Sequence, residues 1–270
     1  MKYSNKMRRF LLFIIFLLAI LEVNGQLLNI DQHEVFSDTA KYVTGSVAFK
    51  FHLDNKNASV DQKNSFIRLE NKNDIVFVGY KNNYLLSSQI KYFNSSGGTF
   101  ISSGYAHARA NYLKMRNTSY ESFTQIQYDR NRYLDYRFLF GGGLRWRIIS
   151  KDKIGLFTGA ELMYEHEKWD NPENENLFII KNLPKIGAYM NFRIKTSETS
   201  KFRSLVIYQT GYDPDPGLMR NRIRFDLQFE IEIFKKLYFT LTYNGAYEDE
   251  PIYPINKFIY TLENGLVWRF

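Results

Sequence analysis

Cysteine is absent from this chain of 270 residues. Its absence excludes disulfide bridges, thiolate metal sites, iron–sulfur clusters and cysteine nucleophiles. The several runs of about 20 apolar residues that a bundle of membrane helices needs are also missing. Disorder is excluded because 17% of the residues are aromatic, with 20 Tyr and 23 Phe. Mean hydropathy is nevertheless negative, at −0.38, and this combination is typical of a large all-β protein.

Positive charge is only mildly in excess. The formal net charge of +8 includes four basic residues near the start, Lys2, Lys6, Arg8 and Arg9, which Glu22 partly offsets. Without these five, 32 basic and 27 acidic residues remain, a net charge of +5. The basic residues are scattered singly, so no nucleic-acid partner is expected.

The first 25 residues have the pattern of a secretory signal peptide. A basic start precedes an unbroken apolar run of 12 residues, 10–21, which is short for a membrane span. Val23-Asn24-Gly25 then predicts cleavage after Gly25, and an uncleaved anchor helix is the alternative. The absence of Cys at the next position argues against a lipoprotein. We therefore expect a cleaved segment 1–25, a periplasmic lead-in 26–42 and a single domain 43–270, exported by the Sec route.

Apolar and polar residues alternate with a period of two through most of the remaining chain, which indicates β-strands. The clearest stretch is 222–233, where one face carries Ile223, Phe225, Leu227, Phe229, Ile231 and Ile233. The other face carries Arg222, Arg224, Asp226, Gln228, Glu230 and Glu232. Such complete separation predicts a strand that lies between two very different media.

The breaks in this alternation predict about twelve strands. Their expected ranges are 43–55, 63–80, 84–95, 99–115, 118–130, 134–150, 153–168, 184–196, 202–213, 219–234, 236–249 and 257–270. Asn71, Lys72, Asn73 and Asp74 interrupt the second range, which predicts a bulge or two short strands there. Tight breaks tend to alternate with longer ones, although the breaks at 96–98 and 131–133 depart from this rule. Short periplasmic turns and longer extracellular loops are typical of an antiparallel transmembrane β-barrel, which is the fold we predict.

A soluble β-sandwich would also alternate, and three features favour the membrane barrel. The expected strands are longer than the usual 5–6 residues of globular proteins and match a tilted membrane crossing. Aromatic residues recur near strand ends, as an interfacial girdle requires. These residues are Tyr84, Tyr92, Tyr128, Tyr164, Trp169, Tyr212 and Tyr247. The third feature is the C-terminal strand, which alternates apolar and aromatic residues up to Trp268 and a terminal Phe270. This ending resembles the insertion signal of bacterial outer-membrane barrels, so we expect Trp268 and Phe270 to be read by the barrel-assembly machinery.

Residues from about 44 to 170 resemble the domain-of-unknown-function 481 family, the YdiY-like salt-induced outer-membrane proteins. The resemblance lies in Ser103-Gly104-Tyr105, Arg109-Ala110-Asn111-Tyr112, Gln127-Tyr128-Asp129-Arg130, Leu134-Asp135-Tyr136-Arg137, Gly141-Gly142-Gly143-Leu144 and Glu161-Leu162-Met163-Tyr164-Glu165. Beyond these residues the chain is similar only to barrel strands in general. The resemblance implies an outer-membrane barrel in contact with lipid and lipopolysaccharide, and it supplies no reaction, ligand or cofactor.

Two groups could carry chemistry. His52 and His107 alternate onto the lumen face, whereas an enzyme acting on lipid needs its His and Ser on the lipid face near a rim. We therefore predict no enzyme activity, with a lipid-modifying enzyme as the remote alternative. The acidic run Glu165, Glu167, Asp170, Glu173 and Glu175 suits a solvated loop better than a cation site, so neither a metal nor a cofactor is predicted.

Charged residues on the predicted lumen face are the most informative set. The candidates are Lys50, His52, His107, Arg109, Arg137, Arg145, Arg147, Glu161, Arg193, Arg222, Arg224, Asp226, Glu230, Glu232 and Glu263, with Glu121 and Glu165 on the same face. One interpretation is a small passive, porin-like channel whose arginines favour a small anionic solute. The alternative is a structural or stress-related envelope barrel whose lumen is closed by ion pairs. We expect the carboxylates that balance Arg222 and Arg224 to come mainly from Asp226, Glu230 and Glu232, further along the same strand, so that the positive and negative groups lie at different depths.

Overall fold

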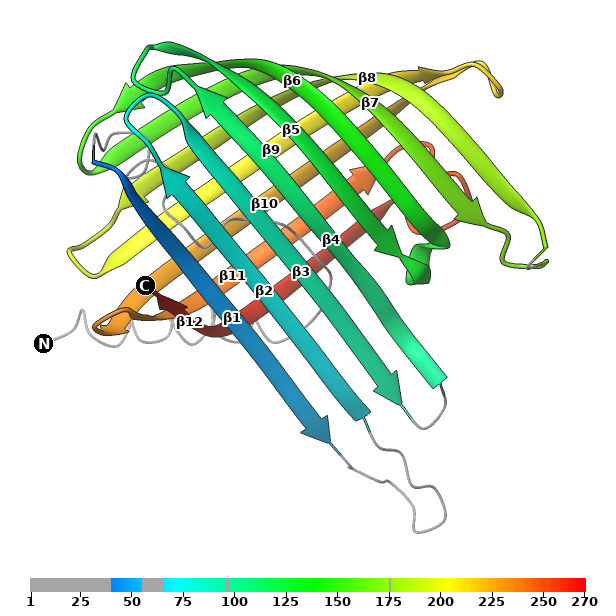
Figure 1. Ribbon diagram of the computed structural model, residues 1–270. Helices are drawn as coiled ribbons and strands as arrows, with labels where there is room; N and C mark the ends of the chain where they lie inside the picture. The colour runs from blue at the N-terminus through cyan, green and yellow to red at the C-terminus, as the bar shows by residue number, and fades with distance from the viewer. Residues whose placement is uncertain (1–39, 55–65, 96–97, 175) are drawn as a thin grey trace, which may run out of the picture.

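The chain folds as a closed antiparallel β-barrel (Figure 1). The computed structural model describes residues 40–54, 66–95, 98–174 and 176–270. Within them lie twelve strands and one 3₁₀ helix, η1 (Arg130–Arg132). The strands are β1 (Tyr42–Asp54), β2 (Phe66–Val78), β3 (Asn83–Ser95), β4 (Gly98–Tyr112), β5 (Thr118–Asp129), β6 (Leu134–Ser150), β7 (Ile154–Asp170), β8 (Phe178–Lys195), β9 (Ser200–Asp213), β10 (Leu218–Phe234), β11 (Leu237–Glu248) and β12 (Phe258–Arg269). The predicted fold class is confirmed, while the expected signal peptide and most of the lead-in lie outside the described residues.

Alternation along each strand separates the inside of the barrel from the outside. In β7, Leu162 faces outward and is 67% exposed, whereas its neighbours Glu161 and Met163 are buried. The outward face is mostly apolar and the inward face mostly polar, the reverse of a soluble protein and the distribution expected for a wall surrounded by lipid. Figure 1 shows β1–β4 crossing in front of β9–β12 at a steep angle, as strands tilted against the barrel axis do.

The barrel closes where β1 meets β12, over a short length. Two residue pairs are in register, Ser46 with Arg269 and Val47 with Trp268. The terminal Phe270 extends the contact, because its N–H donates to the carbonyl of Gly45 at 3.2 Å. A side chain at position 45 would collide with the Phe270 ring, since an added Cβ would lie 2.3 Å from it. The last residue of the chain thus takes part in closing the wall.

The connections differ at the two ends of the barrel. One end carries the turns 79–82, 113–117, 151–153, 196–199 and 235–236, and we call it the short-turn end. The other end carries the longer connections 55–65, 171–177 and 249–257 together with shorter ones, and we call it the loop end. Among the residues described, no helix has the length and apolar character needed to cross a membrane.

Three expectations about individual strands are wrong. The second strand is one continuous element, because Lys72 and Asp74 face inward while Asn71 and Asn73 face outward. The eighth strand starts at Phe178 rather than near 184. Its first part pairs with β7 only, because pairing with β9 begins at Ile186, so Pro184 can be accommodated despite lacking an N–H. Trp169 faces inward and is buried, so it does not belong to the aromatic girdle.

Candidate functional site, the charged lumen

The interior of the barrel is filled largely by charged side chains that pair with one another. Charged groups this deep are stable only when they are paired and hydrogen-bonded, so their arrangement determines what the lumen can admit. Three deeply buried acidic residues are Glu165 and Asp213, both at 0% exposure, and Glu230 at 1%. Each of the three is held by two or more cationic side chains from other positions in the barrel.

The largest group of ion pairs lies in the half of the lumen nearer the loop end. Glu165, five residues from the end of β7, contacts Arg137, Lys185 and Arg222. Arg222 also reaches the carboxylate of Glu248 at 2.7 Å. We call this group the loop-end cluster, and it consists of Arg137, Glu165, Glu167, Lys185, Arg222 and Glu248. Its members come from β6, β7, β8, β10 and β11, so it ties together nearly half of the wall.

A smaller group adjoins the loop-end cluster. Asp213, the last residue of β9, accepts from the Lys181 ammonium at 2.9 Å and from Arg220 Nε at 2.7 Å. Lys181 also binds the exposed Asp215 in the loop that follows. The loop 214–217 is therefore attached to the lumen wall by charge.

A second cluster lies near the short-turn end, on the side of β4–β8. Arg109 binds Glu121 at 2.9 Å and Glu161 at 3.1 Å. The Tyr189 hydroxyl donates to Glu121 at 2.6 Å, and the Arg145 guanidinium lies 3.9 Å from the same carboxylate. We call these five residues the turn-end cluster. Gly143 and Gly159 make room nearby, because an added Cβ would lie 2.2 Å from the carbonyl of Ala160 or from the Tyr189 ring, respectively.

Three further ion pairs lie on the side of β9–β12 and β1–β3. Glu230 binds Arg203 and, at 2.6 Å, Arg269 from the end of β12. Lys91 binds Glu263 at 3.0 Å and thereby links β3 to β12 across the inside of β1 and β2. These pairs support the wall on both sides of the short β1–β12 closure.

Between the two clusters, the lumen wall carries polar side chains, some of which are only partly buried. Tyr105, His107 and Gln125 on β4 and β5 are partly exposed inward-facing side chains, as is Arg224 on β10. Arg224 lies within electrostatic range of Tyr105 and of the buried Asp226. His107 Nδ1 is 3.1 Å from the Gln125 side-chain oxygen. These side chains form a polar, partly exposed stretch of the lumen between the two clusters.

The remaining sequence candidates occupy the short-turn end or lie outside the described side chains. Arg193 donates to the carbonyl of Asp152 at 2.9 Å, and Arg147 donates to that of Lys114 at 2.5 Å, so both bind turns. Glu232 is half-buried beside the bulge in β10. The side chains of Lys50 and His52 lie outside the described residues.

The expectation that the carboxylates opposing Arg222 come mainly from its own strand is wrong. Its carboxylate partners are Glu165, Glu167 and Glu248, which come from β7 and β11. The interpretation of Glu165 and Glu167 as part of a surface loop is also wrong, because β7 continues to Asp170 and turns both side chains into the lumen. Within the described part of the chain, no group of three or more His, Asp and Glu side chains is arranged to hold a metal ion.

His166 is a polar residue on the outward face of the barrel, and the sequence alone predicts no role for it. It faces outward from β7, four residues from the loop end of that strand. Its Nδ1 lies 2.6 Å from the Asn182 side-chain oxygen, and its Nε2 lies 3.3 Å from the Tyr136 hydroxyl. No serine is among these hydrogen-bond partners. The only sequence signal for this group is a His on the apolar face of a strand near its end.

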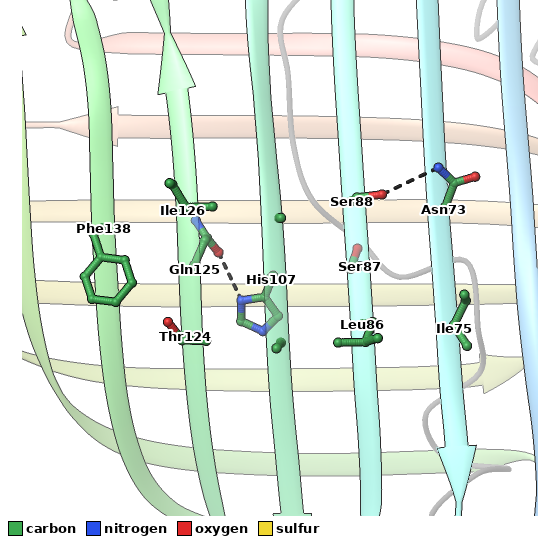
Figure 2. Close-up of a pocket in the computed structure, with 12 residues that line it drawn as sticks. Asn73, Ile75, Leu86, Ser87, Ser88, His107, Thr124, Gln125, Ile126 and Phe138 are labelled. Atoms are coloured by element: carbon green, nitrogen blue, oxygen red, sulfur yellow. Dashed lines mark hydrogen bonds between the residues drawn. The ribbon is translucent and has the colours of Figure 1, made fainter.

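The outer wall carries a hollow of about 500 Å³ over β2–β6 (Figure 2). Most of its lining residues face outward, and they include Ala106 and Ala108 at its floor with Leu86, Ile126 and Phe138 around it. Asn73 and Ser88 also line it and are hydrogen-bonded at 3.5 Å. Because of its position, this hollow belongs to the membrane-facing surface and not to the lumen.

Comparison with known proteins identifies the architecture. The family model described as "Protein of unknown function, DUF481" matches residues 37–258, well beyond the residues on which the sequence resemblance rests. An outer membrane channel from Pseudomonas putida F1 is similar in structure, with a TM-score of 0.51 and 10% identity, covering 92% of this chain and 100% of that one. The NanC porin has a TM-score of 0.41 and 11% identity, covering 85% and 98% of the two chains. No curated protein matches the sequence. At these identities the likeness concerns the fold, which is that of bacterial outer-membrane barrels.

Proposed function

We propose, from the premise that the chain belongs to the DUF481 family and folds as an outer-membrane barrel, that it is a narrow porin-like channel of the bacterial outer membrane. Export by the Sec route with loss of residues 1–25 is part of this proposal. The short-turn end then faces the periplasm and the loop end faces the outside. The protein's surroundings are outer-membrane lipid and lipopolysaccharide.

One observation carries the proposal. The lumen is polar and only partly buried at mid-depth, around Arg224, Tyr105 and His107, with the loop-end and turn-end clusters of ion pairs on either side. A passage lined by charges in a low-dielectric wall admits small ions and excludes larger neutral solutes. Arg224 is a partly buried cation in this middle region, and its positive charge favours anions over cations.

Solute flux into vesicles tests this proposal. Purified protein in phospholipid vesicles should admit chloride-sized anions and exclude trisaccharides, and vesicles without protein supply the control. Equal entry of trisaccharide and chloride would show a wide pore and contradict the proposal.

A closed envelope barrel is the second candidate, and it is favoured by a specific observation. Glu165, Asp213 and Glu230 have no more than 1% of their surface exposed, so water does not reach them in this conformation. If the clusters also seal the middle of the lumen, the barrel is a structural element of the envelope. The absence of any solute flux in the vesicle experiment is the outcome that would select this candidate.

The proposal assigns no catalytic step to the chain. His166 faces the membrane side, but its hydrogen-bond partners are the Tyr136 phenol and the Asn182 amide, and a phenol is a poor nucleophile toward an ester unless it is deprotonated. Purified protein should therefore release no fatty acid from phospholipid or lipopolysaccharide. Release that disappears in His166→Ala would overturn this assignment.

A further inference from the structure

Two connections at the loop end of the barrel touch each other although they belong to opposite sides of the wall. One consists of η1 and Tyr133 and joins β5 to β6, and the other, 249–257, joins β11 to β12. In the closed barrel, β6–β11 separate them in one direction and β12 with β1–β5 in the other. Both lie toward the right in Figure 1. Contacts between them must therefore cross the mouth of the lumen.

Two contacts join the two sides. The Arg132 guanidinium donates to the carboxylate of Glu248, the last residue of β11, at 2.9 Å. The rings of Tyr133 and Tyr253 meet edge to face, with centroids 5.9 Å apart and planes at 71°. We call these four residues the mouth bar. The other oxygen of the Glu248 carboxylate accepts from Arg222 at 2.7 Å, so the mouth bar continues into the loop-end cluster.

Both sides of the mouth bar are held by further hydrogen bonds. On the side of η1, the carbonyl of Tyr133 accepts from the N–H of Asp170 at the end of β7, at 2.8 Å. On the other side, the carboxylate of Asp249 accepts from the backbone N–H and the side-chain amide of Asn221 on β10, at 2.7 and 2.6 Å. The two halves of the mouth bar are therefore anchored to β7 and β10.

Tyr133 has an unusual backbone conformation for a bulky residue. Its φ is 63°, in the left-handed region, where a side chain is crowded against its own backbone. Such a conformation persists only where the surroundings hold it, and it is frequent at functional sites. Glycine would adopt it without strain but would supply no ring. The strain at the end of η1 thus accompanies the ring contact with Tyr253.

We propose that the mouth bar sets the upper size of the solutes that enter the lumen from the outside. The half of the mouth bounded by β6–β11 contains the loop-end cluster and the ion pairs of Asp213, and the mouth bar borders that half. A solute must therefore pass beside the bar. A small ion does so with both contacts intact, whereas a larger solute requires Arg132 to leave Glu248 and the two rings to separate. This inference rests on the proposed channel, because it names the element that limits its size.

Access to a single thiol inside the lumen tests the mouth bar, because the chain has no cysteine of its own. Gln125→Cys places that thiol at mid-lumen, and its reaction rates with a small and with a trisaccharide-sized thiol reagent are measured on whole cells, which the large reagent reaches from the outside. Adding Arg132→Gln and Tyr253→Ala should accelerate the large reagent at least tenfold and leave the rate of the small reagent nearly unchanged. Arg130→Gln with Tyr80→Ala is the matched control, since Arg130 is an exposed residue of η1 and Tyr80 lies in a turn at the short-turn end.

Heat-modifiable migration on a gel verifies that every variant is a folded barrel. Two results would overturn the mouth bar: a large reagent that reacts equally fast with and without the bar substitutions, and an equal acceleration by the control substitutions. The reaction requires no passage through the short-turn end, so its outcome is separate from that of the flux experiment. Bar-dependent labelling in a barrel that passes no ions would refute the channel alone, and a conducting barrel whose labelling does not depend on the bar would refute the bar alone.

Discussion

Glu165 is the residue on which most of the loop-end cluster depends. It contacts Arg137, Lys185 and Arg222 and is fully buried, so three cations share one carboxylate in a place that water does not reach. A buried ion pair of this kind adds little net stability compared with apolar packing. Removing one partner, however, leaves the other charges buried without compensation, which is strongly destabilising. The cluster is therefore sensitive to the loss of Glu165 far more than to the loss of an exposed carboxylate.

Glu165→Gln tests this dependence. It should lower the free energy of unfolding by about 3–5 kcal/mol, the range found when one member of a buried ion pair is removed. Urea unfolding of the barrel in vesicles, followed by tryptophan fluorescence, measures the change. Glu250→Gln is the control, because Glu250 is exposed and its oxygen is 3.8 Å from Lys257. An equal effect of both substitutions would contradict the role of the loop-end cluster.

Arg224 and Arg222 should contribute differently to ion selectivity although they are two residues apart. Arg222 is neutralised by Glu248 and Glu165, whereas Arg224 lies partly exposed at mid-lumen. Arg224→Gln should therefore reduce anion preference, measured as a reversal potential under a salt gradient, more than Arg222→Gln does. The difference should shrink above about 0.1 M salt, where the screening length falls below about 10 Å. A larger loss in Arg222→Gln would show that the ion pairs do not hold in the conducting state.

Alternation predicts which charged residues face inward, but it does not predict their partners. The inward positions of Arg137, Arg222 and Glu165 follow from a period of two. The contact between Arg222 and Glu165 depends on strands that are far apart in the sequence, and it exists only because the wall curves and closes. The outward positions of Asn71 and Asn73 were not predicted either, because the sequence around them predicts a break in the strand.

Among the strands, β12 combines two roles. It ends the sheet along the sequence and closes the barrel against β1, over two register pairs together with the backbone contact between Phe270 and Gly45. Trp268 and Phe270 both face outward, with ring centroids 5.3 Å apart. An unpaired strand edge is unfavourable in lipid. Because the closure is short, the loss of any one of its contacts should weaken it substantially.

Deleting Phe270 should impair assembly. It removes the backbone hydrogen bonds to Gly45 and the terminal aromatic that we expect the assembly machinery to read. The variant should accumulate in the periplasm and be degraded, as should the double substitution Trp268→Ser with Phe270→Ser. Thr261→Ser, on the inward face of the same strand, should assemble normally. Cell fractionation with gels of heated and unheated samples measures this, and normal assembly of the deletion would refute the signal.

Strand boundaries were predictable where a turn interrupts the alternation and less so where a strand extends past its neighbour. The range 134–150 agrees with β6 because Asn131 and Lys151 lie just outside a stretch in which alternation holds over most positions. The start of β8 was missed because the range 169–183 is rich in Asn and predicts a loop, although Phe178 to Leu183 belong to the strand. Asn182 is tolerated there because β8 pairs with β7 alone before Ile186, and the sequence does not show where pairing with β9 begins.

At the scale of the whole molecule, a closed wall and a charged interior are connected features. The apolar outward face requires lipid around the barrel, and the polar inward face then has to pair its charges or remain hydrated. The clusters at the two ends pair most charges, and the middle stays partly hydrated. The function that follows is limited passage of small ions, with the clusters as the narrow points.

Single-channel conductance across a planar bilayer under a potassium chloride gradient tests this claim most directly. The barrel should give small, uniform conductance steps with a reversal potential on the anion side, and Glu165→Gln should enlarge the steps by loosening the loop-end cluster. Large steps that are unchanged in Glu165→Gln would contradict the claim that ion pairs narrow the lumen. A barrel that is folded by its heat-modifiable migration yet silent at every salt concentration and voltage would show that the lumen is closed and that the channel account is wrong.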